Sequence, residues 1–136
     1  MAVRKIDYCK LTVPSRAGRG AEILRALRDE GVSLLAFTGF PVSGGKAQID
    51  LVAPRIADVR RVARKRGWRL GPVKRGFLVQ GRDRVGAVHR HLARLAAQGV
   101  NVTAVDAVAA GGGRFGMILW VKPADYARAA RALGAR

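Results

Sequence analysis

The stretch Glu30-Gly31-Val32-Ser33-Leu34 recurs later in the chain as Gln98-Gly99-Val100-Asn101-Val102, at an offset of 68 in the numbering. In both places, apolar residues at helical spacing lead up to the glycine and β-branched residues follow it. The same offset aligns Arg16-Ala17-Gly18 with Arg84-Val85-Gly86, closer to the start of each copy. Matches that recur in the same order indicate an internal repeat, and a repeat determines the architecture before individual elements are assigned.

A further pair of matching segments lies later in each copy. Residues 48–54 align with residues 117–123, at an offset of 69 rather than 68. We therefore place a one-residue insertion in the glycine-rich segment between the two blocks, where a turn tolerates an extra residue.

Each copy has the same order of predicted elements. Alternating apolar residues predict strands, apolar residues three and four apart predict helices, and Gly31 is typical of a helix C-terminus. In the first copy the elements are strand 6–13, helix 18–30, strands 32–40 and 47–53, a helix from Pro54 and a short strand at 68–70. In the second copy they are strand 77–80, helix 86–98, strands 100–109 and 115–121, and helix 123–133. The order βαββαβ predicts an α+β protein of two ferredoxin-like units in tandem, with both helices of each unit on one sheet face.

The predicted units are residues 1–72 and residues 73–136. Only three residues follow Leu133, which is too few for a fourth strand in the second unit. Since the fourth strand of this fold lies beside the first, we expect residues 77–80 to form an uncovered edge, where another chain can pair.

The composition excludes several classes of protein. The chain has 136 residues, with 26 Lys and Arg against 9 Asp and Glu, and a net charge of +17. Its hydrophobic content of 49% is too high for a disordered chain. No run approaches the roughly 18 apolar residues of a membrane span, and the N-terminus lacks the apolar core of a signal peptide. The single cysteine, Cys9, excludes an internal disulfide and a multi-cysteine metal site, so we expect a soluble cytoplasmic protein.

The positive charge is spread along the chain rather than gathered in one arm. The densest run is residues 60–66, where Val59 and Val62 share an apolar helix face and the basic residues lie largely opposite. This run is either a solvated helix face or a patch for an anionic partner such as a nucleic acid.

No group of residues predicts catalysis. His89 and His91 are two positions apart on a predicted helix, so they point in different directions and cannot share a metal ion. Cys9 has no acid–base partner nearby in the sequence, and the nine acids form no paired-carboxylate motif. The G-x-G-x-x-G match at residues 111–116 precedes a strand instead of the helix that a dinucleotide site needs, and it predicts a hairpin turn. We expect no enzymatic activity, no metal and no cofactor.

The loop between the first strand and first helix of each copy is the remaining candidate site. It reads Pro14-Ser15-Arg16-Ala17-Gly18 in the first copy and Arg82-Asp83-Arg84-Val85-Gly86 in the second. A glycine at the start of a helix lets a ligand approach the backbone, and the free N–H groups there can hold a carboxylate. A plain strand–helix turn is the alternative.

The pattern Asp83-Arg84-Val85-Gly86, followed by Gly99-Val100-Asn101-Val102, resembles the ACT domain, a small-molecule regulatory module. The usual motif is a strand, Asp-Arg-Pro-Gly, and a helix that ends in Gly-Val/Ile-Asn-Ile. The resemblance implies that two units pair side by side through their second strands, giving an eight-stranded (or seven-stranded) antiparallel sheet with helices on one face. It also implies that free amino acids bind at the junction of the units.

The resemblance places the ligand contacts on the loop and at the start of the second strand. In the second copy these are Asp83, Arg84, Val85, Gly86, Asn101 and Val102. In the first copy they are Ser15, Arg16, Ala17, Gly18, Ser33 and Leu34. Ala17 and Val85 replace the proline of the motif, and Ser15 replaces its acid, so the first site is the more divergent one.

The function that these observations predict is a non-catalytic regulatory module that binds an amino acid or similar metabolite between the units and acts in trans, for instance on a metabolic enzyme. The runs 34–37 and 118–121 are apolar at successive positions, so both sheet faces look buried, and we expect a second copy to cover the open face as a homodimer. The alternatives are a structural or protein-interaction pair without a ligand and a basic protein associated with nucleic acid.

Overall fold

The computed structural model describes residues 2–136 and divides them into two compact units. The first unit is residues 7–74, and the second unit is residues 75–136 together with residues 2–6. The sequence predicted units of 1–72 and 73–136. The difference arises because β1 (Ala2–Pro14) is a strand of 13 residues whose N-terminal part belongs to the second unit.

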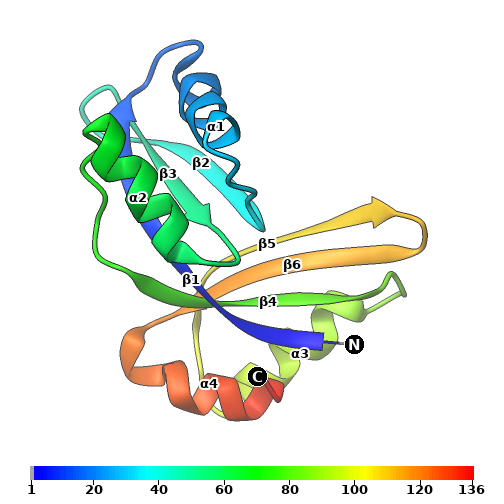
Figure 1. Cartoon of the computed structure of the whole chain (residues 1–136). Helices are drawn as coiled ribbons and strands as arrows, with labels where there is room; N and C mark the ends of the chain where they lie inside the picture. The colour runs from blue at the N-terminus through cyan, green and yellow to red at the C-terminus, as the bar shows by residue number, and fades with distance from the viewer. Residues whose placement is uncertain (1) are drawn as a thin grey trace. The chain divides into compact units, whose positions relative to one another are not determined.

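The first unit consists of the C-terminal part of β1, α1 (Arg19–Asp29), β2 (Ala36–Val42), β3 (Lys46–Val52) and α2 (Ile56–Arg66). The strands are antiparallel in the order β2-β3-β1, and Leu70 forms a bridge with Leu11 where a short fourth strand was predicted. Both helices lie on one face of these strands (Figure 1). Alternation along β3 turns Ile49 and Leu51 toward the helices, where they join a buried apolar cluster. The other members include Val13, Ile23, Leu27, Val59 and Val62.

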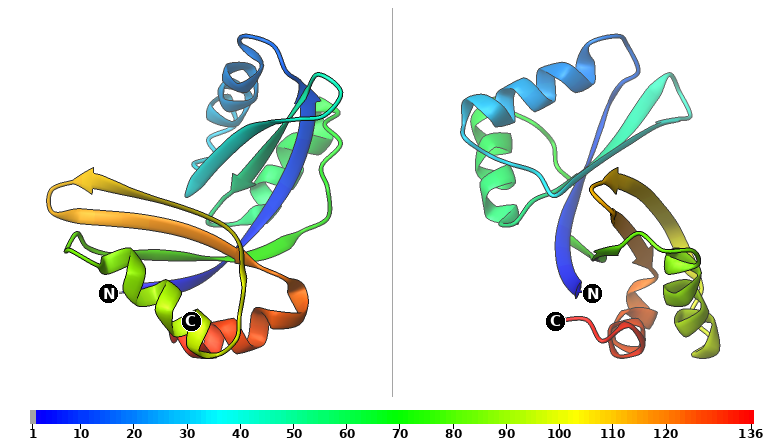
Figure 2. Two further views of the ribbon diagram at one scale, coloured as in Figure 1. Left: turned by 180° about the vertical axis from the view of Figure 1, so that it is seen from behind. Right: turned by 90° about the vertical axis from the view of Figure 1, so that its right-hand side faces the viewer.

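The second unit contains β4 (Lys74–Arg82), α3 (Ala87–Ala97), β5 (Val102–Gly111), β6 (Arg114–Val121), a 3-10 turn η1 (Pro123–Asp125) and α4 (Tyr126–Leu133). Its strand order is β5-β6-β4-β1, and β5 and β6 form a long hairpin (Figure 2). The rings of Phe77 and Tyr126 stack with centroids 4.7 Å apart, which joins α4 to the sheet. The rest of this core includes Val79, Leu95, Phe115, Met117, Leu119 and Ala129.

The second unit has a fourth strand, contrary to the prediction that this strand was missing. Residues 2–6 of β1 occupy the place beside β4, and Val3 is buried in the same apolar cluster as Phe77. Residues 77–80 are therefore covered and do not form an open edge. We expected this strand to follow Leu133, whereas residues 2–6 form it.

The strand register shows that the offset of 68 between the two copies continues into β3 and β6. Leu11 lies opposite Ile49, and Val79 lies opposite Met117, so the offset of 68 relates both residues of the first pair to those of the second. The predicted offset of 69 along this strand is wrong by one position. A one-residue slip exchanges the two faces of a strand, and the alignment of Gln48 with the buried Met117 was such an exchange.

The described strands form a six-stranded antiparallel sheet instead of one with eight or seven strands. In the first unit β2 pairs with β3, and in the second unit β5 pairs with β6. Ile118 and Trp120 are already buried in the single chain, so their apolar character needs no second copy to explain it.

Candidate functional site

The two strand–helix loops have the same backbone geometry. We call residues 15–18 the first loop and residues 83–86 the second loop. The amide of Ser15 donates to the carbonyl oxygen of Gly45 at 2.9 Å, and the amide of Asp83 donates to that of Gly113 at 2.9 Å. Each loop ends in a glycine N-cap of left-handed conformation, Gly18 with φ 86° and Gly86 with φ 80°. A residue with a Cβ rarely adopts this conformation, which is the local reason for the glycine in both copies.

A pocket of about 420 Å³ opens beside the second loop. Four arginines line it: Arg82 from β4, Arg84 from the loop, Arg90 from α3 and Arg114 from β6. We call it the basic pocket. Its remaining lining comes from Gly81, Val85, Gly86 and Ala87. The ion pairs and side-chain hydrogen bonds between described residues involve other arginines, so these four guanidinium groups have no carboxylate partner in the described chain.

A smaller pocket of about 230 Å³ lies against the second loop and β5. Asp83, Arg84 and Gly86 contribute to it from the loop and the helix start, and the other residues are mostly apolar. They are Ala87, Val88, His89, Ala107, Val108, Ala109 and Phe115. Val85 is fully exposed. The second loop thus contributes to a basic pocket and to a largely apolar one.

The arginine of the first loop forms an ion pair with a carboxylate on α1. The two terminal nitrogens of Arg16 lie 3.2 Å from the two carboxylate oxygens of Glu22, and Nη1 of Arg19 lies 2.9 Å from Oε2 of Glu22. The hydrogen bond from Arg19, followed by that from Arg16, lowers the pKa of Glu22. The arginine of the first loop is therefore neutralised by a side chain of its own helix.

The structure places the predicted site residues in two groups. Arg84, Val85 and Gly86 line the basic pocket, and Asp83 lines the apolar one. Ser33 and Asn101 are exposed, whereas Leu34 and Val102 are half-buried, and all four follow the C-terminus of α1 or α3. A helix of 11 residues is about 16 Å long, so these residues lie about a helix length from the loop of their own unit.

Arg90 and Arg114 line the basic pocket but were missed in the sequence, whereas Arg82 belongs to the candidate loop. Arg82 directly precedes the motif, and Arg114 is its cross-strand neighbour, a pairing that only the strand register reveals. Arg90 lies four residues after Gly86, so one helical turn brings it back to the loop. This last signal was available in the sequence.

The other candidate groups have ordinary structural roles. Cys9 is fully buried, and desolvation raises the pKa of its thiol. His91 is also buried, whereas His89 is exposed. Gly112 and Gly113 form the hairpin turn between β5 and β6, within the glycine-rich segment where a turn was predicted. No group of three His, Cys, Asp or Glu residues able to hold a metal ion occurs within residues 2–136. In that same range, no helix is long and apolar enough to cross a membrane.

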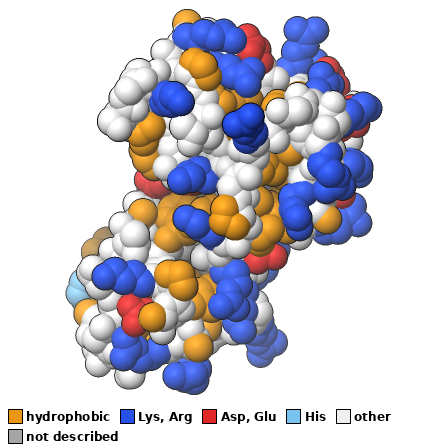
Figure 3. Space-filling view, turned by 90° about the vertical axis from the view of Figure 1, so that its left-hand side faces the viewer, with side chains coloured by type: hydrophobic (Ala, Val, Ile, Leu, Met, Phe, Trp, Pro, Cys, Tyr) orange, Lys and Arg blue, Asp and Glu red, His pale blue; other side chains and the backbone are white. Residues whose placement is uncertain are grey.

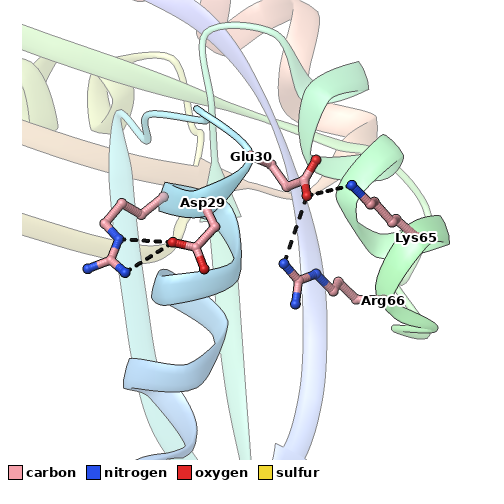
Figure 4. A network of polar contacts seen from close by, with 5 residues as sticks. Asp29, Glu30, Lys65 and Arg66 are labelled. Atoms are coloured by element: carbon pink, nitrogen blue, oxygen red, sulfur yellow. Dashed lines mark hydrogen bonds and ion pairs between the residues drawn. The ribbon is translucent and has the colours of Figure 1, made fainter.

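The basic run on α2 is partly neutralised by acids of its own unit. Nζ of Lys65 lies 2.8 Å and Nη2 of Arg66 lies 3.8 Å from Oε2 of Glu30, which joins α2 to the end of α1 (Figure 4). Arg61 lies 3.6 Å from Asp58. Lys and Arg side chains are scattered over the visible face in Figure 3 and are interrupted by apolar and neutral areas. This distribution favours a solvated helix face.

Comparisons with known proteins bear on the fold. No family model matches the sequence, and no curated protein matches it. A solved structure from Bacteroides thetaiotaomicron is similar, with a TM-score of 0.78 and 15% identity over 97% of this chain and 87% of that one. The ligand-free regulatory subunit of aspartate kinase from Thermus thermophilus has a TM-score of 0.63 and 16% identity, with coverage of 98% and 93%. That of Thermus flavus has a TM-score of 0.59 and 16% identity, with coverage of 98% and 95%. The chain has the ACT-type fold of aspartate kinase regulatory domains, in agreement with the resemblance of its loop motif.

Proposed function

We propose that this chain is a non-catalytic regulatory module that binds a free amino acid or a similar small metabolite and acts in trans on a partner protein. The observation that carries this proposal is the second loop, where Gly86 begins α3 and pockets adjoin the loop. Main-chain N–H groups at such a helix start can hold a carboxylate, although the amide of Ala87 already donates to the carbonyl oxygen of Arg84 at 3.0 Å. The solved relatives from two Thermus species are regulatory subunits of a kinase, so a metabolic enzyme is the class of partner that we propose.

We further propose that the module is a homodimer formed through β5. This strand carries Val and Ala at seven of its ten positions, yet nine of the ten are exposed, and its outer edge has no partner strand among residues 2–136. Val105 and Val108 are exposed by 38% and 65%. An exposed apolar edge strand is a template for pairing with another chain.

A dimer of this kind also gives two of the remaining predicted contacts a role. Asn101 and Val102 are at the start of β5, and Ser33 and Leu34 precede β2. Because Asn101 and Val102 lie about a helix length from the loop of their own unit, we propose that they contact a ligand only when a second copy, paired through β5, brings them to a loop. The dimer through β5 gives no such role to Ser33 and Leu34.

Thermal-shift measurements on the whole chain against the common amino acids test the proposed function. A ligand present at 100 times its dissociation constant adds about 2.7 kcal/mol to the free energy of unfolding. A reproducible rise in melting temperature with one or a few amino acids supports the proposal. No shift with any of them contradicts ligand binding and favours the structural or protein-interaction alternative.

A further inference from the structure

We propose that the ligand of the second loop carries at least two anionic groups, which are carboxylates or phosphates. The first loop does not bind this ligand, because its arginine, Arg16, already forms an ion pair with Glu22. This inference rests on the proposed function and names the chemical class of the effector. It follows from a difference in charge between two loops whose backbone geometry is the same: Pro14 and Glu22 stand in the first unit where Arg82 and Arg90 stand in the second.

Glu22 and Arg90 occupy equivalent positions in the two units. The offset of 68 that relates the two copies also relates these residues, and their amides donate to the carbonyl oxygens of Gly18 and Gly86, each at 3.0 Å. Arg16 and Arg84 are equivalent in the same way. In the first unit, the loop arginine therefore meets a carboxylate on its helix. In the second unit, the same place on the helix carries a further positive charge.

The ion pair between Arg16 and Glu22 at the first loop has no counterpart at the second loop among residues 2–136. The carboxylate of Glu22 receives hydrogen bonds from both terminal nitrogens of Arg16 and from Arg19. This is the planar, two-pronged arrangement in which arginine binds a carboxylate or phosphate. An anion from solution that reaches Arg84 and Arg90 replaces this missing carboxylate.

The basic pocket has arginines from two directions, which is why one anionic group does not satisfy it. Arg84 and Arg90 come from the loop and helix, whereas Arg82 and Arg114 are opposite each other on β4 and β6. Four exposed guanidinium groups around about 420 Å³, with no acid among the lining residues, create a positive potential that attracts anions. A zwitterion with a neutral side chain supplies one negative group and adds an ammonium, so it neutralises the site poorly.

Isothermal titration calorimetry of the whole chain tests the inference with matched ligand pairs. The pairs are L-glutamate against L-glutamine and O-phospho-L-serine against L-serine, which separate carboxylate from phosphate as the second anionic group. We expect at least one acidic ligand to bind about tenfold or more tightly than its neutral counterpart, since a charge-assisted contact is lost in the neutral one.

Arg90→Glu places in the second unit the carboxylate that the first unit has. We expect this variant to lose at least about tenfold in affinity for the acidic ligand. Arg94→Glu is the matched control, because Arg94 is an exposed arginine one turn further along α3 that does not line the pocket, and the change in net charge is identical. The control must retain the wild-type affinity, and far-UV circular dichroism verifies that both variants fold.

Glu22→Gln is the reciprocal variant, since it releases Arg16 and Arg19. We expect the acidic ligand to bind the first loop of this variant only weakly, because Pro14 stands where the second unit has Arg82 and the strand side of the site lacks that arginine. Equal binding of neutral and acidic ligands, with no effect of Arg90→Glu, overturns the inference and leaves the proposed function standing. Equal losses in Arg90→Glu and Arg94→Glu overturn it as well, since general charge is then the cause. Binding of no ligand at all, neutral or acidic, overturns the proposed function itself.

Discussion

The amide of Arg136 donates a hydrogen bond to the carbonyl oxygen of Val3, with the two atoms 3.1 Å apart. Further along β1, the amide of Lys5 donates to the carbonyl oxygen of Arg136 at 2.9 Å. The two ends of the chain are thus joined within the second unit. Its fold depends on residues 2–6, which precede the whole first unit in the sequence.

We expect Val3→Ala to destabilise the protein by about 1–3 kcal/mol, because Val3 is buried against the core of the second unit and its loss leaves a cavity. Urea denaturation measures the effect. Arg4→Thr is the control on the same strand, since Arg4 is exposed, and it should change the free energy of unfolding by less than about 0.5 kcal/mol. Equal effects of the two substitutions would contradict the role given to residues 2–6.

Gly76 is a second position where the packing of β1 on β4 is tested. A Cβ at this residue would lie 3.1 Å from Cδ1 of Ile6 and 3.1 Å from the carbonyl oxygen of Leu119. We expect Gly76→Ala to cost about 1–3 kcal/mol through overpacking. At Gly116 in β6 a Cβ meets nothing within 4 Å, so Gly116→Ala should be neutral or slightly stabilising. Thermal denaturation of both variants checks this order, and the reverse order would show that residues 2–6 do not pack as described.

His91 makes the stability of the second unit depend on pH. Burial lowers the pKa of His91, and the charges of Arg94 and Arg90 lower it further. In the unfolded chain the pKa is about 6.5, so the unfolded state binds the proton more readily. The contribution of neutral His91 is fully present above about pH 6.5 and is lost as the pH falls through the lower pKa of the folded state.

Urea denaturation at pH 7.5 and pH 5.0 measures this dependence. We expect the loss of stability at pH 5.0 to be smaller in His91→Leu than in the wild type. His89→Leu is the control at an exposed position of the same helix, and it should leave the loss unchanged. An identical loss in both variants would show that groups other than His91 produce the pH dependence.

The dimer proposed through β5 is tested by one charge on that strand. We expect Val105→Glu to convert a dimer to a folded monomer, because it places carboxylates at the edge where two copies meet. Leu24→Glu is the matched control, since Leu24 is 40% exposed on α1, an element that the proposed interface does not include. Sedimentation velocity at micromolar concentration reads out the result. A monomeric wild type, or a dimer that survives Val105→Glu, contradicts the proposed interface.

The local elements were predictable because their signals are local. Gly31 and Gly99 end the helices where the sequence placed those ends, and the apolar spacing of Ile23 and Leu27 identified the buried face of α1. The position of residues 2–6 was not predictable in this way. Nothing in those residues indicates that they pair with β4, a strand that follows the whole first unit in the sequence.

The candidate site was predictable only in part, for the same reason. The loop motif identified Arg84 and Gly86, which line the basic pocket. Arg82 and Arg114 become neighbours only through the register of β4 and β6, and a one-residue error in that register hides the relationship. The position of Arg90 near the loop could have been predicted from the sequence, because it lies one helical turn after Gly86. Its role in the proposed site, however, depends on comparison with the ion pair of Glu22.

Chemical-shift mapping by NMR tests the central claim most directly, because it shows where a ligand binds as well as whether it binds. Uniformly nitrogen-15-labelled whole chain is titrated with the amino acid that raises its melting temperature, or with O-phospho-L-serine. The account predicts that the largest shifts occur at the amides of residues 83–87 and at Arg90, with residues 15–18 nearly unchanged. Large shifts confined to other surfaces, or none at saturating ligand, would contradict it.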